Sequence, residues 1–205
     1  MDLLASLERY ANLALKSLDS ERDLLAAIKG LRNGLVYGVR IRAPHALVMV
    51  FLFGSGSFVS KLRAIISMTK THAFNLGRFV FGYKLLCAVL RRMDGQKSQW
   101  HSFISAFCVG YLIFGEENGV NTQINLYLLS RIIYGLVKLG AEKQLIPQPN
   151  FPAFPWFAAT VWGIVLWMFE YHQHVLQGSL QNSMTYLYHD SNVWTSIRNF
   201  LIKNK

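Results

Sequence analysis

Six polar or basic residues stand inside otherwise apolar stretches of this sequence of 205 residues. They are Arg32, Asn33, Arg40, Arg42, Arg78 and Arg131. A guanidinium inside a bilayer costs roughly a few kcal/mol or more, so such residues normally face a bundle interior, a water-filled cavity or a carboxylate partner. One interpretation is therefore a hydrated cavity between helices that prefers anionic solutes or substrates rich in backbone groups.

The same residues also allow a purely structural interpretation. Arg32 and Lys84 can extend along the bilayer to lipid headgroups, and the remaining arginines can form internal ion pairs. The sequence leaves the cavity and the structural interpretation open.

No catalytic or metal-binding pattern accompanies these residues. The sequence contains no Walker loop, no HExxH, no GxSxG and no dinucleotide-binding fingerprint. Its two cysteines, Cys87 and Cys108, lie in apolar stretches and are too few for a disulfide framework or a four-cysteine metal site. We therefore predict that the chain is not an enzyme and holds neither a metal nor a cofactor.

Small residues at four-residue spacing mark helix faces on which a second helix can approach closely. Gly30, Gly34 and Gly38 form a GxxxGxxxG ladder, and Ala106 and Gly110 repeat the spacing further along the chain. In a membrane helix, this spacing places residues with little or no side chain on one stripe. The stripe serves either packing within the chain, which we favour, or the interface of a homo-oligomer.

The polar and small residues described above lie in or beside apolar segments, and these segments are long enough to cross a membrane. Residues 151–169 carry no charge and would extend about 28 Å as a helix, close to the roughly 30 Å hydrocarbon core of a bilayer. Residues 98–115 also lack a charge but form a shorter segment. Three more apolar segments, interrupted by polar residues, are 31–53, 72–90 and 122–140. The pattern predicts an all-α polytopic membrane protein with four to five transmembrane helices.

Composition supports a membrane protein. Hydrophobic residues make up 52% of the chain and charged residues only 16%, whereas about a quarter of the residues in ordinary soluble domains are charged. The net charge of +10 would suggest nucleic-acid binding if the basic residues formed a patch, but they punctuate apolar segments. We therefore predict contact with the lipid bilayer and no nucleic-acid partner.

We predict one membrane domain in three parts. Residues 1–29 form an amphipathic N-terminal arm, residues 31–171 a transmembrane helical bundle, and residues 178–205 an amphipathic tail in the plane of the interface. Lysines and arginines outside the predicted spans divide almost evenly between the two sides, so the positive-inside rule does not assign the orientation of the termini.

Five segments carry a resemblance to a known family. They are LRNGLVYGVRIRAPHALVMVFLF (31–53), LGRFVFGYK (76–84), FGEENGVNTQINLYLLSRI (114–132), WGIVLWMFEYH (162–172) and SMTYLYHDSNVW (183–194). They are similar to vertebrate peroxisomal membrane proteins grouped with Tim-type translocase subunits and related preprotein and amino-acid transporters. The similarity covers nearly the whole chain. One superfamily signature, an arginine followed four residues later by an aspartate, is not met at Arg91, Arg92 and Asp94.

The resemblance implies an integral, multi-pass protein of the peroxisomal membrane. The arginines in the apolar segments favour a solute pore or transport component of that membrane. The alternative is a non-transporting structural or interaction protein that organises this membrane. The resemblance also implies delivery by the cytosolic receptor and chaperone for peroxisomal membrane proteins, which is expected to read basic residues beside a transmembrane helix. The candidates are Lys61, Arg63, Lys70, Arg91 and Arg92, for which headgroup contact is the ordinary alternative.

Overall fold

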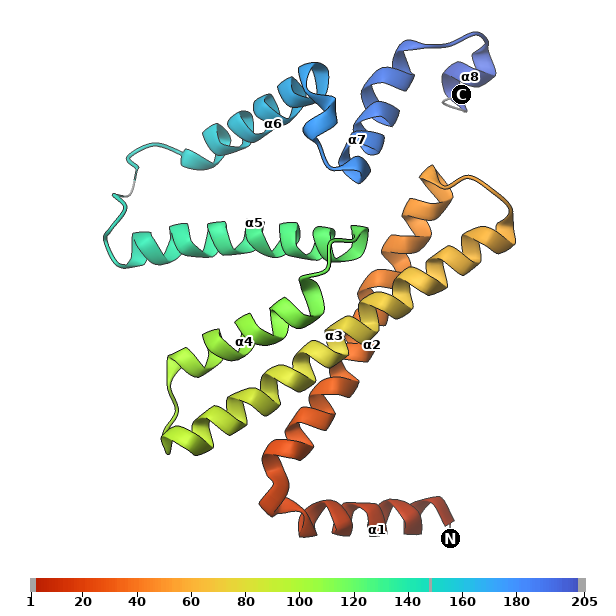
Figure 1. The fold of residues 1–205 in the computed structure, drawn as a ribbon. Helices are drawn as coiled ribbons and strands as arrows, with labels where there is room; N and C mark the ends of the chain where they lie inside the picture. The colour runs from red at the N-terminus through yellow and green to blue at the C-terminus, as the bar shows by residue number, and fades with distance from the viewer. Residues whose placement is uncertain (1–2, 148, 203–205) are drawn as a thin grey trace. The chain divides into compact units, whose positions relative to one another are not determined.

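The computed structural model describes residues 3–147 and 149–202 and shows an all-α chain. Among these residues there are eight α-helices and no strand (Figure 1). The helices are α1 (Leu3–Ser17), α2 (Arg22–Phe53), α3 (Phe58–Asp94), α4 (Gln99–Phe114), α5 (Gly119–Glu142), α6 (Ala153–Tyr171), α7 (Gly178–Met184) and α8 (Ile197–Leu201). The predicted fold class is confirmed. The first two residues of the predicted arm and the last three of the predicted tail lie outside the described residues.

Four helices, α2, α3, α5 and α6, are long and apolar enough to cross a membrane. Every predicted spanning segment corresponds to a helix, but the 16 residues of α4 extend only about 24 Å. This length is less than the roughly 30 Å core of a bilayer, and α4 is not among the four. In contrast, α2 and α3 have 32 and 37 residues and continue past the predicted boundaries. Residues 22–29 of the predicted arm therefore belong to α2.

A short turn, residues 54–57, joins the two longest helices, α2 and α3. Its sequence Gly-Ser-Gly-Ser suits a sharp reversal of chain direction. Gly56 has a φ of +103°, a conformation that costs an L side chain energy but glycine little. The Ser57 hydroxyl oxygen accepts a hydrogen bond from the Ser60 backbone N–H at 3.3 Å, which caps the N-terminus of α3. The turn therefore ends α2 and starts α3 within four residues.

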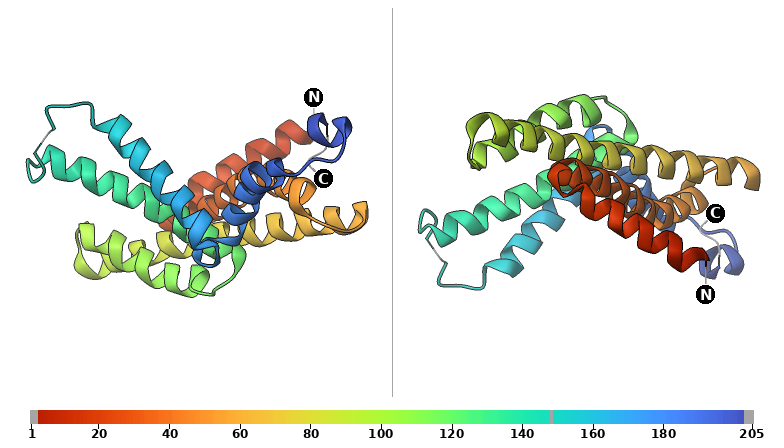
Figure 2. Two further views of the ribbon diagram at one scale, coloured as in Figure 1. Left: turned by 90° about the horizontal axis from the view of Figure 1, so that it is seen from above. Right: turned by 90° about the horizontal axis from the view of Figure 1, so that it is seen from below.

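The resulting hairpin of α2 and α3 is held together by close backbone contact, and the two helices stay side by side in the views of Figures 1 and 2. Gly30, Gly34 and Gly38 are all buried on the α2 face that meets α3. A Cβ atom added at Gly34 would lie 2.7 Å from the Gly77 Cα, and one at Gly38 would lie 2.6 Å from the Ala73 Cα. The glycine ladder therefore forms a contact within one chain, between α2 and α3.

Helix α4 folds back along α3 with a looser fit (Figure 1). A Cβ atom added at Gly82 of α3 would lie 3.2 Å from the Val109 Cγ1 of α4. At Gly110, such an atom would only touch Phe79, at 3.9 Å from its Cε2, and Ala106 is half-buried. The second pair of small residues therefore contributes less to close packing than the ladder of α2.

The N-terminus of α4 is capped by its own side chains. The Ser98 hydroxyl oxygen accepts from the Trp100 N–H at 3.3 Å, and His101 Nδ1 accepts from the Ser98 N–H at 3.4 Å. The His101 ring is held in this position by Asp94, whose Oδ2 lies 2.6 Å from Nε2. These bonds satisfy backbone donors that a helix start leaves without partners.

Ser98→Ala should lower the free energy of unfolding by about 1 kcal/mol, because the cap is lost and a backbone donor is left without its partner. Thermal unfolding of the protein in neutral detergent, followed by circular dichroism, measures the change. Ser55→Ala, in the exposed turn before α3, is the matched control and should leave the midpoint in place. Equal midpoints for both variants would contradict a stabilising cap at Ser98.

The chain divides into two compact units, Met1–Ile133 and Tyr134–Lys205. In the second unit, Phe169 of α6 is fully buried, with ring centroids 6.2 Å from Tyr188 and 4.5 Å from His189. Glu170 Oε1 also lies 3.6 Å from His189 Nε2. The predicted tail thus folds as short helical turns, of which residues 185–189 cover the end of α6. Whether the chain forms one membrane domain stays a prediction.

Candidate polar site around Arg42

Arg42 is the buried member of the six predicted cavity residues, with 9% of its surface exposed. It lies on α2 about 17 Å before the end of that helix, counting 1.5 Å for each residue. Arg42 is therefore well removed from the end of a helix that is long and apolar enough to cross a membrane.

Side chains from three helices converge on this guanidinium. Nη1 donates a hydrogen bond to Gln123 Oε1 of α5 at 2.7 Å and lies 3.3 Å from Nδ1 of His45, one turn further along α2. Nη2 lies 3.8 Å from the Met68 Sδ of α3. His72 lies one helical turn after Met68 on the same face of α3. We call Arg42, His45, Met68, His72 and Gln123 the Arg42 cluster.

The Arg42 cluster contains a cation without a matching anion. Arg42 takes part in none of the ion pairs among the described residues. Its Nε and the His72 Nδ1 are buried and have no hydrogen-bond partner in the part of the chain that the structure describes. A buried polar group without a partner costs about 1–3 kcal/mol. These atoms are therefore available to a ligand or to water that brings hydrogen bonds.

The other five predicted cavity residues do not join this cluster. All five are exposed. Arg32 donates to the adjacent Asn33 at 3.0 Å, Arg78 donates to Asn75 at 2.9 Å, and Arg131 lies over the Tyr127 ring at 4.9 Å from its centroid. Arg40 and Arg42 are separated because two residues along a helix correspond to a rotation of about 200°. The structure thus does not gather the six residues around one cavity.

A second polar contact fixes the start of α5 against α3. Asn121 is 1% exposed, and its Oδ1 accepts from Asn75 Nδ2 at 3.3 Å. Asn121 Nδ2 in turn donates to the Glu116 carbonyl at 3.0 Å. The Asn118 side chain accepts from the Val120 and Asn121 N–H groups and caps α5. These bonds hold Gln123, two residues further on, in place beside Arg42.

The predicted targeting residues fall into two groups with different surroundings. Arg91 and Arg92 both face Asp23 of α2, with nitrogen to oxygen distances of 2.5 and 3.8 Å. In the other group, Lys61 lies over the Phe51 ring at 5.5 Å from its centroid, and Arg63 and Lys70 are exposed. The first pair is therefore engaged within the chain, and its role in targeting stays a prediction.

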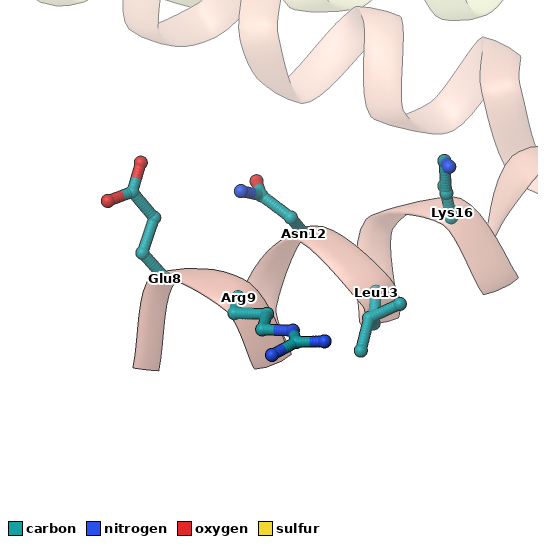
Figure 3. Close-up of a pocket in the computed structure, with 5 residues that line it drawn as sticks. All are labelled: Glu8, Arg9, Asn12, Leu13 and Lys16. Atoms are coloured by element: carbon teal, nitrogen blue, oxygen red, sulfur yellow. The ribbon is translucent and has the colours of Figure 1, made fainter. Parts of the chain in front are cut away.

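An open hollow of about 330 Å³ lies on α1 (Figure 3). Its lining residues are Glu8, Arg9, Asn12, Leu13 and Lys16. All five come from this single helix, and Glu8, Asn12 and Lys16 point to the same side of it in Figure 3. No second element closes the hollow among its lining residues, so the Arg42 cluster is the stronger candidate for a functional site.

Comparison with known proteins places this arrangement in a family. Residues 22–130 match the Tim17/Tim22/Tim23/Pmp24 family. The chain belongs to this family. It is 57% identical over 196 residues to peroxisomal membrane protein 4 of Bos taurus, an alignment that covers 96% of this chain and 92% of the relative. To peroxisomal membrane protein 4 of Homo sapiens it is 56% identical over 181 residues, which are 88% of this chain and 85% of the relative. No solved structure matches the chain.

The family match spans α2, α3, α4 and the first part of α5, and so contains the whole Arg42 cluster. With four helices suited to crossing a membrane and relatives of this identity, the chain is an integral, multi-pass protein of the peroxisomal membrane. The predicted family and location are confirmed. Sequence reasoning found Arg42 but missed His45, Met68, His72 and Gln123. Their only signal was a polar or sulfur-containing side chain in an apolar segment.

Proposed function

We propose that the chain is a solute-conducting component of the peroxisomal membrane and that the Arg42 cluster binds an anionic solute on its way across. The proposal rests on one observation, a buried guanidinium that faces no carboxylate among the described residues. Membership of a family that includes translocase subunits supports it.

The free energy of burying this cation favours a functional role. Removing a guanidinium from water costs several kcal/mol, even after the protein relaxes. Hydrogen bonds to a charged group return roughly 1.5–3 kcal/mol each. Of the contacts that Arg42 makes with His45, Gln123 and Met68, the bond to Gln123 is the shortest, at 2.7 Å. A residue that served only to hold helices together would be better matched by a carboxylate. An anion that arrives from solution supplies the missing charge.

The donors in the cluster suit a small carboxylate or another oxyanion. Arginine presents its N–H groups as a planar fork that matches two oxygen atoms at once. Among the described residues, Arg42 Nε has no partner and Nη2 has only the weak acceptor Met68. The buried His72 ring nitrogen, one turn after Met68 on α3, adds a further polar group. The cluster therefore offers both a positive charge and directed hydrogen bonds.

Proteoliposomes test the proposal with two solutes of similar size, anionic glycerate and neutral erythritol. Arg42→Gln should reduce glycerate flux at least tenfold, because it removes the charge while it keeps a polar side chain in the same space. Arg42→Lys retains the charge and should keep part of the flux. Arg40→Gln is the matched control, since Arg40 is exposed on the same helix, and it should conduct as the wild type does.

Wild-type vesicles that remain tight to both solutes, or an Arg42→Gln protein with unchanged glycerate flux, would overturn the proposal. The Arg42→Gln protein is expected to stay folded, because the substitution removes a cation that pairs with no carboxylate of residues 3–147 and 149–202. Gel filtration of each purified variant before reconstitution checks this expectation.

A second candidate function is that of a non-transporting protein that organises the membrane. Helices α5 and α6 favour it, since Asn121 and Phe169 are their only buried residues among those described. Such apolar surfaces face lipid or a further protein, including a second copy of the chain. Tight wild-type vesicles together with a defined oligomer in light scattering would favour this function. Delivery by a cytosolic receptor for peroxisomal membrane proteins is likewise a proposal that follows from the family.

A further inference from the structure

We propose that a phosphate-bearing anion binds in a cavity where the start of α2, the end of α3 and the start of α4 meet. The ligand chemistry is an anionic phosphate group, supplied either by a lipid headgroup or by free phosphate. This site is separate from the Arg42 cluster and does not depend on solute conduction.

The cavity has a volume of about 310 Å³ and is lined by residues of all three helices and of the turn before α4. This volume lies at the lower end of the range for small-molecule sites, about 300–1,000 Å³. Its lining combines apolar residues, including the buried Ala88, with polar and charged side chains. A cavity of this size accommodates a headgroup phosphate but not a large cofactor.

The charges around the cavity are mostly positive. Lys84, Arg91 and Lys97 line it together with a single carboxylate, that of Asp23. Asp23 is engaged by Arg91 at 2.5 Å and by Arg92 at 3.8 Å. Neither Lys84 nor Lys97 belongs to an ion pair among the described residues. Two ammonium groups therefore remain without an internal counter-charge beside the same cavity.

Close helix contact directs Lys84 along this part of the hairpin. A Cβ atom added at Gly30 would lie 3.0 Å from Cδ and 3.4 Å from Cε of Lys84. The missing side chain of Gly30 thus makes room for the aliphatic stem of Lys84, whose ammonium group extends beyond it. Gly30 of the ladder therefore acts on the cavity through the position of Lys84, which lines it.

The wall formed by α4 adds hydrogen-bond donors and acceptors. Ser98 and Ser102 line the cavity beside His101, whose ring is held by Asp94 with Nε2 to Oδ2 at 2.6 Å. Because the start of α2, the end of α3 and the start of α4 meet here, the cavity lies at the ends of two helices that can cross a membrane. Basic residues at such a level attract anionic headgroups, at roughly 1 kcal/mol for each Lys or Arg.

Calorimetric titration of the full-length protein in neutral detergent tests the proposal. The probes are dioctanoyl phosphatidic acid and inorganic phosphate, titrated separately and in competition at one salt concentration. The Kd of the probe that binds should rise at least tenfold in the Lys84→Gln/Lys97→Gln protein. The Lys84→Arg/Lys97→Arg protein keeps both charges and should bind within about threefold of the wild type.

The matched control is Lys70→Gln/Lys143→Gln, which removes the same charge from exposed positions elsewhere. It should bind as the wild type does. Lipid binding that added phosphate does not displace identifies the headgroup as the source. Phosphate binding that displaces the lipid identifies the free anion. Absence of binding by the wild type, or equal binding by the Lys84→Gln/Lys97→Gln protein, would overturn the proposal. Failure of the Arg42 flux experiment would leave this result untouched.

Discussion

Gly34→Ala is expected to destabilise the protein, whereas Gly135→Ala should stabilise it. Both glycines lie within long helices, where alanine is favoured over glycine by about 1 kcal/mol. A Cβ at Gly34 would meet the Gly77 Cα at 2.7 Å and the Leu76 carbonyl oxygen at 2.8 Å. A Cβ at Gly135 would meet nothing within 4 Å. The gain in helix propensity is therefore the same for both substitutions, and they differ only in the tertiary contacts of the new Cβ atom.

The cost at Gly34 is large because the obstacle is backbone. Overpacking in a core typically costs 1–3 kcal/mol, even where side chains can adjust. At Gly34, α2 and α3 must move apart, and the contacts at Gly38 and Ala73 are then weakened as well. We expect a net loss of about 2 kcal/mol or more for Gly34→Ala, since the clash exceeds the propensity gain, and loss of the folded hairpin for Gly34→Leu.

Unfolding in mixed detergent micelles, followed by circular dichroism, measures these changes. Gly135→Ala controls for the intrinsic effect of alanine. If Gly34→Ala were as stable as Gly135→Ala, the close contact of α2 with α3 would not exist in the folded protein. If Gly34→Ala changed only the size of the complex in gel filtration, the ladder would serve an interface between copies instead.

Gln123→Glu is expected to reduce glycerate flux through the reconstituted protein at least tenfold while the fold is preserved. The substitution places a carboxylate where Gln123 Oε1 now lies, 2.7 Å from Arg42 Nη1. The resulting ion pair gives Arg42 a permanent counter-charge, because a hydrogen bond between two charged groups is stronger than one to an amide. A solute anion then meets a neutral site, and flux should fall at least tenfold.

This variant separates conduction from stability. Arg42 is already buried, so the new carboxylate pairs an existing charge and should not lower the unfolding midpoint. Asn182→Asp, an exposed change of the same kind in α7, is the control and should leave both flux and midpoint unchanged. Normal glycerate flux through Gln123→Glu would exclude Arg42 as the binding group. A protein that no longer folds would show that the cluster does not tolerate a carboxylate, and the Arg42→Gln result then decides.

The helices could be predicted because each carries its own signal. The uncharged run in 151–169 reappears as α6, and the segments 31–53 and 72–90 reappear within α2 and α3. The boundaries were less predictable, since hydropathy marks the part of a helix that lipid can cover. The helical backbone hydrogen bonds do not depend on hydropathy and continue past that part, so α2 begins at Arg22 and α3 runs on to Asp94.

The candidate sites could be predicted only in part. The arginines were visible as charges in apolar segments, but which one is buried depends on helix rotation and on the path of the hairpin. Arg42 and Gln123 are far apart in sequence, and no local pattern pairs them. Lys84 and Lys97 were visible as basic residues, yet their shared cavity forms only because α4 folds back along α3.

The sequence alone determined the class of this protein. Apolar length, helical spacing and the family motifs establish a multi-pass helical protein of the peroxisomal membrane, because these properties are local or inherited along the chain. Only the tertiary structure decided that the glycine ladder packs within the chain and that two lysines share one cavity. It also decided that Arg42 pairs with no carboxylate in the described part of the chain. These features depend on which helix faces meet, and the burial of one face against another is set by the whole fold.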